Sequence, residues 1–296
     1  MASSLLKPAP LRTGARRGLL DAPAPLRLWH LASLDAPTVA VAWALAFAWV
    51  AGLRLPAWTP VLLALGTWVV YIGDRLLDAR SGLRSGALHR LRERHFFHWR
   101  HRRALLPAAT VAGVVAAAII FILMPAGIRE RNSVLGVAAL AYFSGVHSRC
   151  RAPWWLLPLL SKESLVGLLF TAGCALPTLT RMRLADAPNA AMGLMLALIA
   201  FFAALAWLNC HAIERWESAV HATRISAAAG LLAFIGLVLA CVIAPLQSRA
   251  AALFAAGAAS ALLLALLDRA RHRVTPLALR AAADMVLLTP LVLVLR

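Results

Sequence analysis

Long apolar runs, separated by short breaks rich in arginine or proline, recur along the chain from residue 36 onward. A hydrocarbon core about 30 Å thick is crossed by about 20 helical residues. Nine segments of about that length fit, at 36–54, 57–78, 103–127, 133–148, 154–178, 189–213, 225–246, 248–268 and 276–295. Strands are excluded because an open sheet edge leaves unpaired backbone groups in lipid. We therefore expect an all-α polytopic protein, with nine transmembrane helices forming one domain over residues 36–296.

Composition supports this assignment and argues against a water-soluble protein. Hydrophobic residues make up 62% of the chain and charged residues only 14%, whereas a soluble domain carries about 25% charged residues. The net charge of +18 would suggest nucleic-acid binding in a soluble protein, but no aromatic stacking platform accompanies the basic residues. The four cysteines are far apart and form no CxxC pair, so they indicate neither a zinc site nor a disulfide framework.

The distribution of basic residues orients the expected helices. With the N-terminus in the cytoplasm, twenty Lys and Arg residues fall in the N-terminal segment and the inner loops, and seven fall outside. Basic residues accumulate in cytoplasmic loops, so we expect an N-inside, multi-pass protein of a bacterial inner membrane. Residues 1–35 contain Arg16 and Arg17 without an apolar signal region after them, and we expect a flexible, basic cytoplasmic arm.

Two aspartates at the cytoplasmic end of the second expected helix are the first candidate site. Asp74 and Asp78 are spaced i, i+4 and share one helical face. Two such charges about 4 Å apart repel by about 4 kcal/mol at an effective dielectric near 20, and a divalent cation removes that repulsion. Mg²⁺ is commonly bound by one or two carboxylates together with substrate phosphates, so the pair fits a diphosphate site. Alternatively, Asp78 pairs with Arg75 and the acids mark the water boundary.

The surrounding segment, GDRLLDARSG, resembles part of the NDxxDxxxD motif of the UbiA superfamily of intramembrane prenyltransferases. That resemblance implies a nine-helix bundle with this motif at the cytoplasmic end of helix 2. Asp74 and Asp78 match its second and third aspartates. Tyr71 stands at the first aspartate and Val70 at the preceding asparagine, which leaves one metal ligand fewer.

Two further segments extend the resemblance. The stretch from Tyr142 through Lys162 is similar to the family's helix 4 to helix 5 region, in which a tyrosine precedes a lysine that contacts the diphosphate. The segment ALAWLNCHAIERWESAV ends the sixth expected helix, where the family carries a second acidic motif, and Asn209, Glu214 and Glu217 occupy that place. A glutamate pair at i, i+3 departs from the family's DxxxD in residue type and spacing.

The resemblance implies a Mg²⁺-dependent enzyme that moves an isoprenyl group from a diphosphate donor to a lipophilic acceptor. The metal ligands implied are Asp74, Asp78, Glu214 and Glu217, the catalytic residues are Asp74, Asp78 and Lys162, and the diphosphate-binding residues are Arg84, Tyr142, Lys162 and Asn209. Trp68, Tyr71 and Trp207 are candidates to stabilise an allylic cation through their ring faces.

The sequence bears on two alternatives to a prenyltransferase, another membrane enzyme and a non-enzymatic protein. A CDP-alcohol phosphatidyltransferase needs a DG dipeptide, and the chain contains none. A catalytically inactive membrane protein of UbiA-like fold that binds a lipid or a partner protein stays open, because both acidic motifs are altered. Arg280 and Asp284 lie i, i+4 within the last expected helix, where mutual pairing would limit the cost of charge in the bilayer.

Overall fold

The structure, a computed structural model, describes residues 20–86, 91–147, 162–218 and 224–295. Helices make up its regular structure, and within these residues the only β-type pairing is an isolated bridge between Leu20 and Val274. In chain order the helices are α1 (Ala24–Leu31), α2 (Asp35–Val50), α3 (Trp58–Arg84), α4 (Glu93–Arg100), α5 (Arg102–Ala118), η2 (Ile119–Leu123), α6 (Ala126–His147), α7 (Lys162–Leu184), α8 (Asn189–Glu217), α9 (Ile225–Ile243), α10 (Ser248–Ala270), η4 (Arg271–Arg273), α11 (Pro276–Met285), η5 (Val286–Leu288) and α12 (Leu291–Val294).

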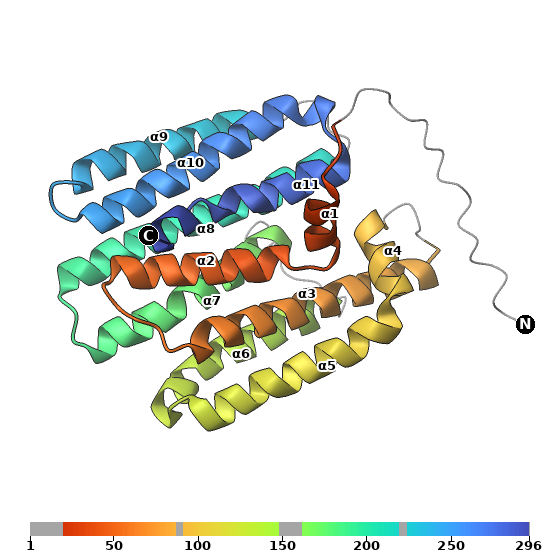
Figure 1. The fold of residues 1–296 in the computed structure, drawn as a ribbon, viewed down its shortest axis with the longest axis horizontal. Coiled ribbons are helices and arrows are strands. Elements are labelled where there is room, and N and C mark those ends of the chain that lie inside the picture. The colour runs from red at the N-terminus through yellow and green to blue at the C-terminus, as the bar shows by residue number, and fades with distance from the viewer. Residues whose placement is uncertain (1–19, 87–90, 148–161, 219–223, 296) are drawn as a thin grey trace, which may run out of the picture.

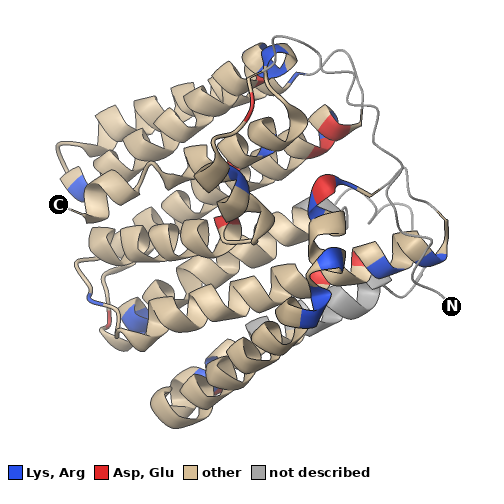
Figure 2. Cartoon of the chain, turned by 45° about the vertical axis from the view of Figure 1, so that its right-hand side comes forward, with Lys and Arg blue, Asp and Glu red and all other residues tan. Residues whose placement is uncertain are grey.

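The long helices run roughly side by side, while the short helices α1 and α4 lie together at one end of the bundle (Figure 1). Helix α10 packs between α9 and α8, and α8 in turn packs against α7. Helix α2 contacts both α3 and α7, and α3 also contacts α5. Much of the bundle's length lacks charged residues, whereas charged positions gather at helix ends (Figure 2). This arrangement is the one expected for helices that cross a membrane.

Seven helices are long and apolar enough to cross a membrane among the described residues, and the count is eight if α1 and α2 form one bent span. The expectation of an all-α, multi-pass membrane protein is therefore confirmed. The expected number of nine is reached only if α6 also spans. Its 22 residues are helical and cover residues 133–147 of the segment expected at 133–148, but it is not among the seven.

The segment expected to be a flexible arm contributes a helix to the fold where the structure describes it. Helix α1 meets α2 at an angle of 87°. The connection passes through Ser33, which is fully buried and has a φ of 59°. A serine in the left-handed region is uncommon and persists where surrounding contacts hold it. Residues 1–19 of that arm lie outside the described residues.

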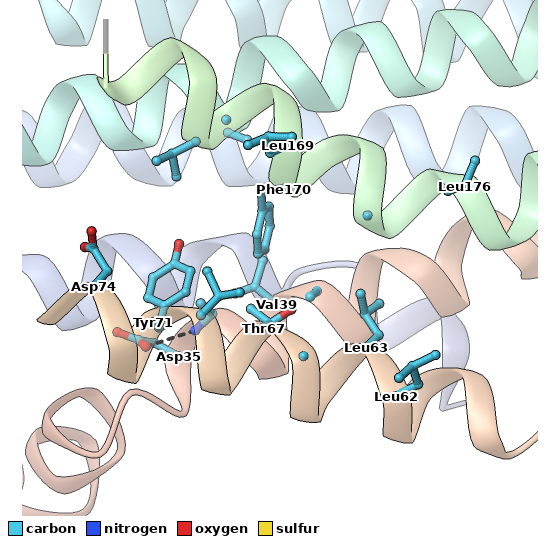
Figure 3. A pocket seen from close by; sticks show the side chains of 18 of the residues that line it. Asp35, Val39, Leu62, Leu63, Thr67, Tyr71, Asp74, Leu169, Phe170 and Leu176 are labelled. Atoms are coloured by element: carbon cyan, nitrogen blue, oxygen red, sulfur yellow. Dashed lines mark hydrogen bonds between the residues drawn. The ribbon is translucent and has the colours of Figure 1, made fainter. Parts of the chain in front are cut away.

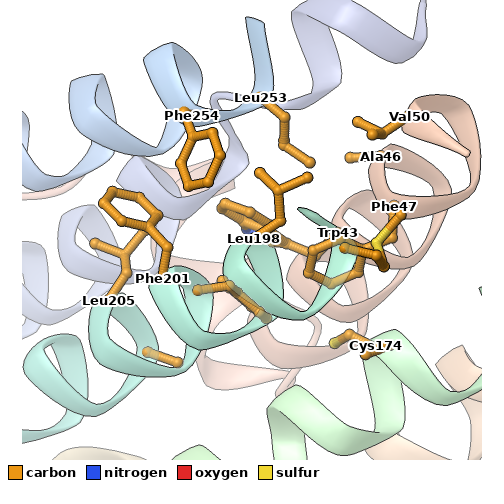
Figure 4. Packing of buried hydrophobic residues seen from close by; sticks show 14 of the residues in the cluster. Trp43, Ala46, Phe47, Val50, Cys174, Leu198, Phe201, Leu205, Leu253 and Phe254 are labelled. Carbon is orange, nitrogen blue, oxygen red and sulfur yellow. The ribbon is translucent and has the colours of Figure 1, made fainter. Parts of the chain in front are cut away.

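The core is built around Trp43 of α2, which is fully buried (Figure 4). It stacks on Phe202 of α8 with ring centroids 3.9 Å apart. Its indole Nε1 donates a hydrogen bond of 2.9 Å to the carbonyl oxygen of Leu287 in η5. That carbonyl lies where α11 gives way to a 3₁₀ turn. Trp43 thus joins three elements through one apolar and one polar contact.

The break in the last span follows from Pro290. Proline has no N–H and cannot donate to the carbonyl four residues earlier. The carbonyl of Val286 instead accepts a hydrogen bond of 2.7 Å from the hydroxyl of Ser260 on α10. Thr289 donates to the carbonyl of Ala256 at 2.8 Å. Backbone groups freed by the break are therefore satisfied by a neighbouring helix, as the bilayer interior requires.

Candidate functional site

A cavity of about 870 Å³ runs along α3. Its lining includes Trp58 near the start of α3 and Asp78 near its end, and 20 helical residues rise by about 30 Å. Helices α2, α6, α7, α8 and α11 provide the other walls. Figure 3 shows side chains of α3 and α7 facing this space, with Asp74 and Tyr71 at one end and Leu62 at the other. The cavity thus extends across most of a bilayer's thickness.

The acidic residues predicted from the two separate motifs line this one cavity. Asp74 and Asp78 reach it from the end of α3, and Glu214 and Glu217 reach it from the end of α8. Asn209, two turns before Glu217, also lines it and is almost fully buried. Carboxylates that are about 140 residues apart in sequence are therefore gathered at one end of the bundle, on a shared space.

Glu217 is surrounded by arginines. Its Oε1 lies 2.7 Å from a guanidinium nitrogen of Arg280 on α11 and 3.0 Å from one of Arg94 on α4. Arg92 approaches Oε2 at 3.6 Å and also donates to the Glu217 carbonyl. The hypothesis that Arg280 pairs with Asp284 on its own helix is wrong, because Arg280 turns to Glu217 instead. Glu217 therefore joins α4, α8 and α11.

Arginines supply positive charge at the same end of the cavity. Arg75, Arg94 and Arg280 all line it. Burial, together with the neighbouring Arg280, lowers the pKa of Arg94 to about 9, and the contact with Glu217 opposes that effect. Arg94 therefore stays cationic at neutral pH. Guanidinium groups recognise phosphate oxygens through paired hydrogen bonds, so the arginines at this end of the cavity can bind an anion.

Arg75 faces away from Asp78, the partner considered from sequence, and toward the bend between α1 and α2. It is 3% exposed and donates to the hydroxyl of Ser33 at 2.6 Å and to the carbonyl of His30 at 3.1 Å. Ser33 also lies 2.9 Å from Nε2 of His98, whose Nδ1 lies 2.7 Å from the Arg94 carbonyl.

These contacts fix the protonation of the His98 ring. A carbonyl only accepts, so Nδ1 of His98 carries the proton and Nε2 accepts from the hydroxyl of Ser33. Burial lowers the pKa of His98 to about 4, in keeping with a neutral ring. Neighbouring His95 also lines the cavity, and burial together with the charge of Arg94 lowers its pKa to about 3. Both histidines are therefore neutral, and His98 joins α4 to the bend between α1 and α2 through Ser33.

Several predicted residues do not join the described cavity. Arg84 is exposed at the last residue of α3 and is not part of the lining. Trp68 instead donates its indole N–H to the carbonyl of Ala32, and Trp207 is stacked on His211. The side chains of Tyr142 on α6 and Lys162 at the start of α7 lie outside the described residues.

Tyr71, which stands at the family's first aspartate position, does line the cavity. The guanidinium carbon of Arg75 lies 5.8 Å from the centroid of its ring. In Figure 3 the Tyr71 side chain lies beside Asp74 on the same stretch of α3. Of the three aromatic residues considered from sequence as cation-stabilising groups, Tyr71 is the one that faces this space.

The middle of the cavity is apolar and is widened by glycines. Leu63, Val70, Phe170 and Leu176 contribute to its walls, together with Gly66. A methyl group added at Gly66 would meet no atom within 4 Å, so the missing side chain leaves open space. This part of the cavity suits a long hydrocarbon chain, since apolar side chains line it and polar groups gather at its ends.

Sequence reasoning missed three residues at the acidic end, namely His30, Asp35 and Asp284 as a group. The sequence pattern indicates Asp284 only as a partner for Arg280, and it places Asp35 at the end of the expected arm. The presence of Asp35 and Asp284 in apolar helices could have indicated this site, because a carboxylate in a membrane helix is costly and is usually functional or paired. Their convergence depends on the bend between α1 and α2, which the sequence pattern did not predict.

No family model, curated protein or solved structure matches this chain. The function is therefore inferred from the residues that line the cavity.

Proposed function

We propose that this protein is a UbiA-like intramembrane prenyltransferase, which moves an isoprenyl group from a diphosphate donor to a lipophilic acceptor with the help of Mg²⁺. The observation that carries the proposal is that Asp74 and Asp78 of α3 and Glu214 of α8 line the same cavity, which continues as an apolar channel along α3. The acidic end would hold the diphosphate head group of a donor, and the apolar channel that follows it would hold the isoprenoid tail.

The donor set at the acidic end suits magnesium. Asp74, Asp78 and Glu214 offer carboxylate oxygens, the ligand type that Mg²⁺ prefers alongside substrate phosphates. Glu217 contacts Arg94 and Arg280, so we assign it a structural role. Bound Mg²⁺ would neutralise the charge that develops on the diphosphate leaving group.

The protein's own groups support the same reaction. The bond between C1 and the bridging oxygen breaks, its electron pair leaves with diphosphate, and the acceptor forms a bond to C1 and releases a proton. Arg94 and Arg280 line the cavity where the leaving group would lie and favour its negative charge. The ring of Tyr71 provides a π-face near an allylic cation. Apolar walls keep water from capturing that cation.

The same proposal includes the cellular location. The multi-pass architecture and the excess of basic residues in alternate loops favour a bacterial inner membrane with the N-terminus in the cytoplasm. Asp74, Asp78 and Glu214 would then face the compartment that supplies water-soluble diphosphates.

Binding of a diphosphate donor tests the proposal directly. The full-length protein in detergent is titrated with radiolabelled geranylgeranyl diphosphate, with Mg²⁺ or with EDTA, and geranylgeraniol serves as the ligand without a diphosphate. We expect Mg²⁺-dependent binding that Asp74→Asn and Asp78→Asn each abolish. Asp186→Asn is the matched control, because Asp186 is exposed in the loop between α7 and α8. Equal binding by all variants, or no binding by the wild type, would refute the site.

Transfer itself is tested in cells. Lipid extracts from cells that express the wild type, Asp78→Asn or Asp186→Asn are compared by mass. A lipid whose mass exceeds that of an acceptor by whole isoprenyl units should appear with the wild type and Asp186→Asn only. If the prenylated lipid also appeared with Asp78→Asn, Asp78 would be excluded from catalysis.

A second candidate function follows from the position of Glu217. Because three arginines surround this acid, the acidic end carries fewer available carboxylates than a duplicated aspartate motif would. A lipid-binding protein without transferase activity would use the arginines and the apolar channel alone. In that case the protein would bind anionic lipid equally well in EDTA and after substitution of Asp74 or Asp78.

A further inference from the structure

Three residues from separate elements converge beside the acidic end of the cavity. His30 ends α1, Asp35 begins α2, and Asp284 lies on α11. Nδ1 of His30 is 2.6 Å from Oδ2 of Asp35 and 3.5 Å from Oδ2 of Asp284. One ligand atom from each of the three residues fits within a 4.8 Å span. His30 and Asp35 are 1% and 2% exposed, so this cluster lies inside the protein.

The two carboxylates are oriented in the same way. Oδ1 of Asp35 accepts a hydrogen bond of 2.9 Å from the N–H of Ala36, and Oδ1 of Asp284 accepts one of 3.3 Å from the amide of Asn209. In each case the protein holds one oxygen, and the other oxygen, Oδ2, turns toward His30. Hydrogen bonds that fix the ligating side chains in this manner are a regular feature of metal sites.

His30 itself has no hydrogen bond through Nδ1. Although two carboxylate oxygens lie close, neither contact has hydrogen-bond geometry, and this buried nitrogen has no other partner. Oδ1 of Asn209, a side chain that is 3% exposed, is likewise buried without a partner. Buried polar atoms in folded proteins nearly always have partners, and exceptions point to a bound ion or water. Nδ1 of His30 and one oxygen of each carboxylate therefore lie close enough together to share one ion.

The spacing agrees with a coordination shell. Ligand atoms about 2.1 Å from a metal, at right angles to one another, are separated by about 3.0 Å. The separations of 2.6 and 3.5 Å from His30 to the two carboxylates lie on either side of that value. Asp35 and Asp284 also line the cavity, which gives an ion a route in and leaves positions for water.

The charge balance leaves room for a cation. Arg75 lies 3.5 Å from Oδ2 of Asp35 and offsets part of that charge. Within the described residues, Asp284 has no lysine or arginine at ion-pair distance, since Arg280 is paired with Glu217. A buried carboxylate without a cation is costly, and a divalent ion shared by both acids would offset that cost.

We propose that His30, Asp35 and Asp284 form a binding site for a divalent transition-metal ion of the Zn²⁺ or Mn²⁺ type, with Asn209 holding Asp284 in place. An imidazole nitrogen beside two carboxylates suits these ions, whereas Mg²⁺ favours oxygen ligands alone. The site is separate from the proposed magnesium ligands and does not depend on prenyltransferase activity. Its position joins α1, α2 and α11, so a bound ion would also fasten the bend between α1 and α2.

Zinc binding to the whole protein tests the assignment. The full-length protein in detergent is stripped with a chelator and dialysed against Zn²⁺ in excess Mg²⁺, and bound zinc is measured by mass spectrometry. We expect one zinc per chain for the wild type and none for His30→Ala or Asp284→Asn. Asn209→Ala removes only the supporting amide and should weaken binding by about 10–100-fold. Zinc should raise the melting temperature of the wild type and leave that of Asp284→Asn unchanged.

Two control variants distinguish this site from zinc binding by other side chains. His101 is exposed between α4 and α5, so His101→Ala should bind zinc as the wild type does. Asp74→Asn should also keep its zinc, whether or not it binds a diphosphate. The proposal fails if the wild type binds no zinc in excess Mg²⁺, if folded Asp284→Asn still holds one equivalent, or if His101→Ala or Asp74→Asn is the variant that loses it.

Discussion

Replacement of Glu217 by glutamine would remove the one negative charge shared by Arg280 and Arg94. The Glu217 carboxylate lies 2.7 and 3.0 Å from their guanidinium nitrogens, and its side chain is 24% exposed. Unit charges about 4 Å apart attract by about 4 kcal/mol at an effective dielectric of 20. Loss of one partner from a buried ion pair usually costs about 3–5 kcal/mol, because the remaining charge stays buried. Partial exposure of this group favours the lower end, about 3 kcal/mol.

Thermal unfolding in detergent, without added metal or diphosphate, measures this cost. A loss of about 3 kcal/mol corresponds to a fall in melting temperature on the order of 10 °C for a protein of this size. Glu214→Gln is the matched control, because Glu214 lies one turn earlier on α8 and is exposed. It should leave the melting temperature nearly unchanged.

A double variant then identifies the source of the effect. Arg280→Met in the Glu217→Gln background removes the charge left behind, so part of the lost stability should return. If Glu217→Gln melts at the same temperature as Glu214→Gln, Glu217 does not hold α4, α8 and α11 together. The argument that separates it from the magnesium ligands would then be refuted.

Two further predictions concern packing and pH. The ring of Phe201 lies so close to Gly257 that an added Cβ would fall 2.6 Å from it, so Gly257→Val should lower the melting temperature by overpacking, at a cost of about 1–3 kcal/mol. A Cβ added at Gly193 meets nothing within 4 Å, so Gly193→Ala should not lower the melting temperature. Equal melting temperatures of the two variants would contradict this packing. Burial lowers the pKa of His98 to about 4 in the folded protein, whereas an exposed histidine has a pKa of about 6.5. At a pH between these two values the unfolded chain binds more protons than the folded one, so stability should fall as the pH drops through this window. His98→Gln should flatten the fall in melting temperature, and an unchanged profile would show that another group titrates there.

The membrane spans could be located from sequence because their signal is local. A run of about 20 apolar residues is enough to mark a helix that crosses lipid. The segment expected at 189–213 lies within α8, and the one expected at 57–78 lies within α3 apart from its first residue. The positions of Asp74 and Asp78 near the end of α3 followed from the same pattern. Since α3 and α8 end on the same side of the bundle, their acids line the same cavity.

Side-chain partners could not be predicted in the same way. Spacing along the helix offers Asp78 as an alternative partner for Arg75, and Asp284 as the partner for Arg280. In the structure each arginine contacts a different element. Spacing along one helix defines which residues share a face, but the neighbour that packs against that face sets the ion pair. A guanidinium on a long, flexible stem reaches across helices as readily as along one.

The sequence by itself determined that this chain is helical, that it crosses a membrane several times, and that acids stand at the ends of two of its helices. These properties follow from apolar length and from residue spacing, which are independent of how helices pack. Only the tertiary structure decided that His30, Asp35 and Asp284 meet, because they come from α1, α2 and α11. Their meeting depends on the 87° turn at Ser33 and on the packing of α11 against α2, and no local pattern encodes either one.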